Sequence, residues 1–141
     1  MLDAKIWRVD SPVTACYRYF SGLNLSAAVA RDEEPPGWDG STPLVLIRDG
    51  GGNRQELNLR HGRVTIDVRH PEPGGAYDLA EKIHELFCLW VFTDAPVIFD
   101  PHNIDSPAYN PSDSPRVPAY TFTVTIAVKS ENKISANNIG A

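Results

Sequence analysis

The feature of this sequence that most constrains its fold is a strict alternation of residue types across residues 119–129, AYTFTVTIAVK. Successive side chains of a β-strand point to opposite faces, so a period of two predicts a strand with one apolar and one polar face. The apolar face would hold Tyr120, Phe122, Val124, Ile126 and Val128, while threonines and Ala127 occupy the other. A half-buried strand of this kind is typical of an antiparallel sheet with one solvated face.

Other segments supply further strands. Residues 63–69 alternate in the same way, with β-branched residues on one face and charged residues or threonine on the other. Residues 43–48, PLVLIR, are apolar up to the final arginine, which predicts a central strand covered on both faces. Residues 25–31 and 97–99 carry weaker strand patterns. These segments predict a sheet of about four to five strands.

Two segments have helical patterns. Residues 12–21 follow a capping Asp10 or Ser11, begin with a proline and precede Gly22, which suits a helix end. The apolar face of this helix would hold Val13, Cys16, Tyr17, Phe20 and Leu23. Residues 2–9 could add a further helical turn or two before it.

The second helix is the stronger of the two, over residues 76–92. Its stripe at helical spacing consists of Leu79, Ala80, Ile83, Leu86, Phe87 and Trp90. Trp90 is therefore expected in the core. The order of elements predicts an α+β fold: an antiparallel or mixed β-sheet with two main helices packed on one face.

The remaining segments are irregular. Residues 101–118 contain five prolines, which predicts an extended connection rather than a regular element. Residues 130–141 lack periodicity and aromatic residues, so we expect a flexible C-terminal tail. At 141 residues, the chain fits a single domain over residues 1–129 followed by that tail.

The stretch LIRDGGGNRQ, residues 46–55, raises the question of a phosphate-binding loop. Such a loop needs the pattern G-x-x-x-x-G-K-[ST] opening a helix, and this stretch lacks both the Lys-Ser/Thr pair and a helical pattern after it. Glycine, aspartate and asparagine are also the residues that turns require. We therefore interpret the glycines as a hairpin tip or flexible loop.

Catalytic and metal signatures are weak. HELFC, residues 84–88, resembles the zinc motif H-E-x-x-H, but Cys88 stands where the second histidine belongs. The other histidines, His61, His70 and His102, adjoin predicted turns with no paired ligand motif nearby. The acidic run Asp32, Glu33 and Glu34 lies in a predicted loop and is expected to solvate it. No catalytic, cofactor or metal residue is therefore assigned.

Charge and cysteine content narrow the class of protein. The net charge is −5 and the isoelectric point about 5.2, which argues against a protein that grips nucleic acid through phosphates. The two cysteines, Cys16 and Cys88, are expected to be reduced and to lie on apolar helix faces, which favours the cytoplasm. The N-terminal residues do not resemble a signal peptide, and no apolar run reaches the ~20 residues of a membrane span.

Four stretches in order resemble a known family: MLDAKIWRVDSPVTACYRYF, PLVLIRDGGGNR, RVTIDVRHPEPGGAYDLAEKIHELF and SPAYNPSDSPRVPAYTFTVTIAVK. Together they look like a tail terminator protein of long-tailed, siphovirus-type bacteriophages, of the kind found in actinobacterial phages. The resemblance spans roughly residues 3 to 129, and it rests on fold-shaping patterns rather than a catalytic signature. Residues 53–62 have no place in the family pattern.

The resemblance implies a structural virion protein at the head-proximal end of the tail, assembled in the host cytoplasm. Such proteins form a hexameric ring that caps the tail tube, ends its polymerisation and gives the head connector a docking surface. The implied partners are further copies of the chain, the major tail tube protein and the connector. DNA passes through without specific binding, no membrane is involved, and neither enzymatic activity nor a cofactor is implied.

Candidate contact residues lie where we expect exposure. They are Arg48, Asp49, Gly50, Gly51, Gly52, Asn53 and Arg54 around the glycines, with Trp38, Tyr109 and Arg116 in the irregular segments. Three alternatives stay open: a phage neck or head-completion protein of related fold, a small metal-dependent hydrolase using His61, His70, His84 or His102, and a nucleic-acid-binding module. Threonines on the open face of residues 119–129 count against the last, which would need exposed aromatics there.

Overall fold

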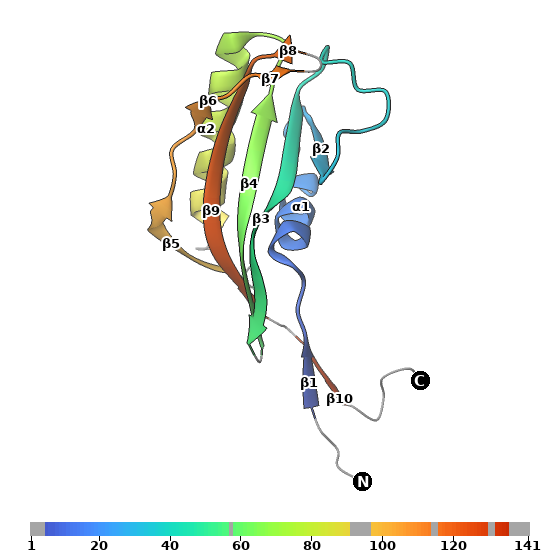
Figure 1. Cartoon of the computed structure of the whole chain (residues 1–141), viewed down its shortest axis with the longest axis vertical. Helices are drawn as coiled ribbons and strands as arrows, with labels where there is room; N and C mark the ends of the chain where they lie inside the picture. The colour runs from blue at the N-terminus through green and yellow to red at the C-terminus, as the bar shows by residue number, and fades with distance from the viewer. Residues whose placement is uncertain (1–4, 57, 91–96, 114–115, 130–131, 136–141) are drawn as a thin grey trace.

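A computed structural model describes residues 5–56, 58–90, 97–113, 116–129 and 132–135 (Figure 1). Side chains are described for these residues except 5–8, 56, 99–103 and 132–135. In this part of the chain, two helices cover one face of a six-stranded mixed sheet, which confirms the predicted α+β fold. The helices are α1 (Pro12–Ser21) and α2 (Pro73–Trp90). The sheet order is β2-β3-β4-β9-β5, with β6 beside β9.

The sheet is built from β2 (Ala28–Arg31), β3 (Leu44–Glu56), β4 (Leu59–Arg69), β5 (Val97–Ile104), β6 (Ala108–Tyr109) and β9 (Ala119–Lys129). β2 runs parallel to β3, and the other pairs are antiparallel. β4 and β9 pair along their whole lengths, from Leu59 opposite Lys129 to Arg69 opposite Ala119. β9 therefore lies inside the sheet, between β4 and β5.

The first helix forms as its sequence predicts. Ser11 caps it, and its Oγ accepts a hydrogen bond from the Thr14 amide at 3.1 Å. Pro12 occupies the first turn, where no amide donor is needed, and Gly22 caps the other end. Val13, Cys16 and Phe20 of the predicted face are buried, while Tyr17 and Leu23 are partly buried against the core.

The core lies between the helices and the sheet. Phe20 of α1, Phe87 of α2 and Phe122 of β9 meet there, with ring centroids 6.0 Å apart for Phe20–Phe87 and 6.2 Å for Phe87–Phe122. Trp90 is 4% exposed, which confirms its predicted place, and it stacks on Tyr19 at 4.4 Å. α2 begins at Pro73, three residues before the predicted start, since Pro73 suits a first turn.

Two small strand pairs lie outside the main sheet: β1 (Lys5–Arg8) with β10 (Asn132–Ser135), and β7 (Ser112–Asp113) with β8 (Arg116–Val117). The predicted helical turn over residues 2–9 is wrong for residues 5–8, because their backbone pairs with β10 rather than with itself. The predicted tail thus includes β10, and a domain boundary at residue 129 stays a prediction. The proline-rich connection contains the end of β5 and the short strands β6, β7 and β8.

A basic arm and a polar clamp as candidate functional sites

The hairpin of β3 and β4 extends beyond the helices. In Figure 1 the lower end of this hairpin lies below both α1 and α2. We call residues 49–56 and 59–63 the arm. β3 runs through the three glycines to Glu56, and Leu59 opens β4 opposite it. The prediction that the glycines form the hairpin tip is therefore wrong. Residues 53–56 and 59–62, which had no place in the family pattern, belong to the two strands of the arm.

The glycines interrupt the ladder between β3 and β4 instead of reversing the chain. The register shifts between Asp49 and Gly51 and again between Gly51 and Arg54. Gly51 and Gly52 have φ of 93° and 73°, a region that other residues enter at a cost. The Asp49 carboxylate accepts a hydrogen bond from the Gly51 amide at 2.8 Å. The stretch is thus an irregular strand, with no helix behind it to receive phosphate.

Cations gather on the arm although the whole chain is acidic. Arg54 and Arg63 are exposed on its two strands, and Lys129 lies beside Leu59 at the end of β9. Arg60 is partly buried: its Nε donates to Asn53 Oδ1 at 2.9 Å, and its Nη1 donates to the Val9 carbonyl at 3.4 Å. The arm therefore presents two exposed arginines, with the exposed carboxylate of Asp49 nearby, and Arg60 ties the arm to Val9.

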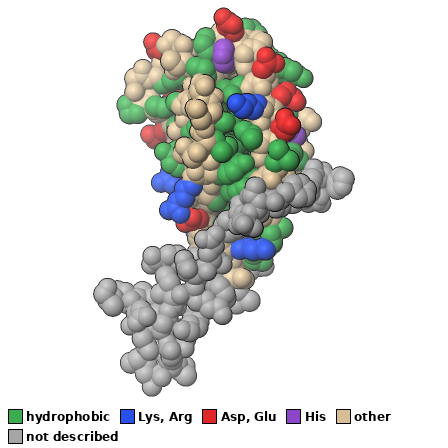
Figure 2. All heavy atoms as spheres, turned by 180° about the vertical axis from the view of Figure 1, so that it is seen from behind, with side chains coloured by type: hydrophobic (Ala, Val, Ile, Leu, Met, Phe, Trp, Pro, Cys, Tyr) green, Lys and Arg blue, Asp and Glu red, His purple; other side chains and the backbone are tan. Residues whose placement is uncertain are grey.

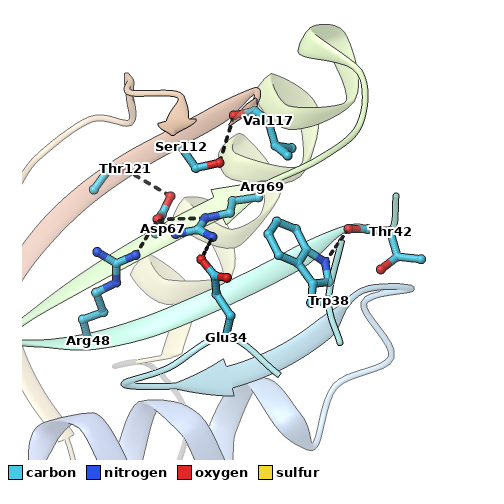
Figure 3. Close-up of polar contacts among 9 residues, drawn as sticks. All are labelled: Glu34, Trp38, Thr42, Arg48, Asp67, Arg69, Ser112, Val117 and Thr121. Atoms are coloured by element: carbon cyan, nitrogen blue, oxygen red, sulfur yellow. Dashed lines mark hydrogen bonds and ion pairs between the residues drawn. The ribbon is translucent and has the colours of Figure 1, made fainter. Parts of the chain in front are cut away.

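The sheet face opposite the helices carries a polar clamp, drawn in Figure 3. The buried guanidinium of Arg69 donates to Asp67 Oδ2 from Nε at 3.1 Å and from Nη2 at 3.0 Å. Arg69 also donates to the Glu34 carboxylate. Arg48 Nη2 lies 3.2 Å from the same Asp67 oxygen, and Thr121 Oγ1 donates to the other oxygen at 3.4 Å.

The clamp fixes the loop between β2 and β3 onto the sheet. The Trp38 ring lies 5.3 Å from the Arg69 guanidinium carbon, and Trp38 Nε1 donates to the Thr42 carbonyl at 3.0 Å. Glu34 was expected to solvate this loop, but it pairs with a buried cation instead. Burial alone would lower the pKa of Arg69, yet the hydrogen bond to Glu34 and the charge of Asp67 raise it above its ordinary value.

Sequence reasoning missed the clamp. Its visible signal was the pair Asp67 and Arg69, two positions apart and therefore on the same face of a strand. The sequence pattern placed these opposite charges on the face away from Val64, Ile66 and Val68, and no partner was assigned to them. The structure shows them 7% and 3% exposed, because the loop carrying Glu34 and Trp38 lies over them.

The ten candidate contact residues fall into separate places. Arg48 to Arg54 lie together on β3. Trp38 is connected to Arg48 indirectly, because its ring contacts Arg69 and both arginines bind Asp67. Tyr109 lies on β6, 54% exposed, with its ring 5.3 Å from that of Tyr120. Arg116 is exposed on β8. The structure therefore does not gather Tyr109 and Arg116 with the residues around the glycines.

The histidines and acidic residues form no cluster of three possible metal ligands within the residues that the structure describes. His84 Nδ1 lies 3.9 Å from Cys88 Sγ on α2, and His70 Nδ1 accepts from the Glu72 amide at 3.0 Å. The side chain of His102 lies outside the described part. None of the described helices is long and apolar enough to cross a membrane.

The two cysteines differ in burial. Cys16 is 0% exposed, and burial raises the pKa of its thiol far above the usual range. Cys88 is partly exposed on α2, and partial burial followed by the charge of Glu85 raises the pKa of its thiol. Both environments disfavour the thiolate, so neither cysteine resembles an activated nucleophile.

Comparisons with known proteins add little. No protein-family model matches the sequence, and no curated protein is close enough to count as a relative. A solved structure with 11% identity matches at a TM-score of 0.42, covering 84% of this chain and 91% of the other. A likeness this weak carries no argument, so the functional inference rests on the residues and their geometry.

Proposed function

We propose that this chain is a tail terminator of a long-tailed bacteriophage, forming a ring, with six copies as the expected number, on the end of the tail tube. In this role it ends tube polymerisation and gives the head connector its docking surface. The proposal begins from the ordered sequence resemblance and requires neither a catalytic centre nor a cofactor.

The observation that carries the proposal is the arm. A ring subunit needs one surface for its neighbours and another, along the ring axis, for the tube. The arm reaches beyond the layer of helices, with Arg54 and Arg63 exposed on its strands. Strands that present exposed arginines suit contact with an acidic rim, since guanidinium groups pair well with carboxylates. We assign the arm to the tube.

The ring itself is testable with purified protein and tail tubes assembled from the major tail protein of the same phage. Light scattering measures the mass of the protein alone, and negative-stain images score the tube ends that carry a ring. We expect capped ends of uniform appearance and tubes that stop growing. A chain that stays monomeric and never binds tube ends would contradict the proposal.

The role of the arm is tested by charge reversal. Arg54→Glu/Arg63→Glu should reduce capping about tenfold or more, since each lost charge pair at an interface is worth at least ~1 kcal/mol. Asn24→Glu/Ser106→Glu is a control that also adds two carboxylates, at exposed positions away from the arm and from the candidate contact residues. Equal capping by both double variants would remove the arm from the tube contact.

A further inference from the structure

The outer side of α2 carries a line of exposed residues that meets nothing within the chain's described part. Asp78, Glu81, Glu85 and Leu89 follow one another at spacings of three or four residues, which places them in one row along the helix. All four are exposed, Leu89 by 52%. Figure 2 shows red side chains in a row on this side. The exposed Lys82 follows Glu81 in the same helix. We call these four residues the α2 line.

The opposite side of the helical layer has the complementary chemistry. A groove of about 550 Å³ lies between α1 and β2, lined by Thr14, Tyr17, Arg18, Val29, Ala30, Arg31 and Pro35. Its lining mixes the apolar Val29, Ala30 and Pro35 with Thr14, Tyr17 and two exposed arginines. Figure 2 shows blue side chains gathered on this side of the molecule. We call it the α1–β2 groove.

The two arginines are held in different ways. Arg31 Nη1 donates to Thr14 Oγ1 at 2.9 Å, and its guanidinium carbon lies 5.7 Å from the Tyr17 ring centroid. The Arg18 side chain is 68% exposed and pairs with Asp10 at 2.5 Å. An exposed pair of this kind contributes little stability, so Arg18 can exchange Asp10 for another carboxylate at small cost.

The two surfaces cannot meet within one molecule. β2 is at one edge of the main sheet and β5 at the other; α1 packs on the β2 side and α2 on the β9 side (Figure 1). A second copy of the chain carries both surfaces. Its α2 line offers carboxylates for the two arginines of the groove and Leu89 for the apolar residues there. The complementarity within one sequence therefore identifies the partner as another copy.

We propose that the α2 line of one copy docks in the α1–β2 groove of the next, with Glu81 and Glu85 against Arg18 and Arg31. Leu89 then covers the apolar floor beside Val29 and Ala30. This head-to-tail contact joins two different surfaces, and its repetition closes a ring when the rotation per copy allows it. The inference rests on the proposed function, because it names the surfaces by which the ring is built.

Two charge-reversed variants test the contact. Glu81→Arg/Glu85→Arg makes both surfaces basic, and Arg18→Glu/Arg31→Glu makes both acidic. Each variant alone should associate at least about tenfold more weakly than the unmodified chain, by sedimentation velocity with and without tail tubes. Glu72→Arg/Asp105→Arg, at exposed positions off both the α2 line and the α1–β2 groove, carries the same charge change as the first variant and should associate normally.

Mixing the two variants in equal amounts provides the decisive test of the contact. The basic α2 line of one variant fits the acidic groove of the other, and the acidic line of the second fits the basic groove of the first. We therefore expect the mixture to recover association, with the variants alternating around the ring. The chain carrying all four substitutions should also associate with itself. Circular dichroism of each variant checks that the fold is intact.

The outcomes separate this contact from the ring proposal. Rings from the unmodified chain and from both separate variants alike would overturn the contact and leave the ring. Loss in both variants without recovery in the mixture would show that the two surfaces face something else, such as the tube, and would also overturn it. An unmodified chain that stays monomeric with tubes present would overturn both.

Discussion

The two faces of the central sheet are buried by different chemistry. On the face of β4 toward the helices, Val64, Ile66 and Val68 are each 0% exposed within an apolar core. On the other face of the same strand, Asp67 and Arg69 are nearly as buried, but their neighbours are charges and an indole ring. The first face gains stability from area removed from water. The second depends on every charge keeping its partner.

The largest loss of folding stability is expected from a substitution on the helix-covered face of the sheet. Phe87→Ala removes the ring that joins α2 to Phe20 and Phe122, and it should lower the free energy of unfolding by about 3–5 kcal/mol. Urea denaturation followed by circular dichroism measures it. The control on the same helix, Leu89→Ala, removes a side chain that is 52% exposed and should change stability by about 0.5 kcal/mol or less. Equal effects of the two substitutions would contradict the described core.

Substitutions on the open face should lower the free energy of unfolding by less, and a second substitution should restore part of that loss. Arg69→Ala leaves Asp67 and Glu34 without their buried cation and should cost about 3 kcal/mol. Arg69→Met/Asp67→Val replaces both charges with apolar groups, so its stability should lie closer to that of the unmodified chain. Urea midpoints of the single and double variants decide between them. A double variant that is less stable than Arg69→Ala would mean that the clamp stabilises beyond charge compensation.

The glycines of the arm allow a smaller test with an internal control. Gly51→Ala places a Cβ at a φ of 93° and should destabilise the chain by about 1 kcal/mol through backbone strain, although the space is open. Gly74→Ala also enters open space, but within α2 and without positive φ. It should stabilise the chain by up to about 1 kcal/mol, because alanine favours a helix. Thermal melts of the pair should therefore move in opposite directions, and shifts of the same sign would exclude backbone strain as the cause at Gly51.

The smallest effect is expected from the polar pair at the middle of the open face. Thr65 Oγ1 and Thr123 Oγ1 lie 3.2 Å apart on β4 and β9, partly exposed. Thr123→Val removes that hydrogen bond but keeps a β-branched shape, so the change should be about 0.5 kcal/mol or less. A decrease of more than about 2 kcal/mol in the free energy of unfolding, measured by urea denaturation, would indicate that the two threonines are as buried as Asp67 and Arg69.

Local patterns predicted the parts of the fold that they determine. Ser11, Pro12 and Gly22 mark the ends of α1 by their own chemistry, and the alternation along β9 assigns each side chain to a face. The full length of β3 was not predictable in this way. Glycine, asparagine and arginine are poor strand signals, and their strand conformation depends on β4, which supplies the pairing partners.

Contacts between distant segments account for the rest. Glu34 meets Arg69 across 35 positions of sequence, and β1 pairs with β10 across nearly the whole chain. Neither contact leaves a local period, so sequence reasoning placed Glu34 in solvent and residues 5–8 in a helix. The candidate contact residues on β3 were predicted from glycine-rich composition, and their role stays a prediction that the arm variants test.

The position of β9 inside the sheet has a consequence for biosynthesis. The ribosome produces α1, β2, β3, β4 and α2 well before residues 119–129, yet β4 needs β9 along its full length. Until those residues emerge, the nascent chain holds an unpaired strand edge beside a finished hairpin, a state prone to aggregation. The sheet therefore cannot be completed before residues 119–129 have left the ribosome. Translation stalled before residue 119 should leave a chain that proteases or chaperones recognise, and release of the remaining residues should resolve it.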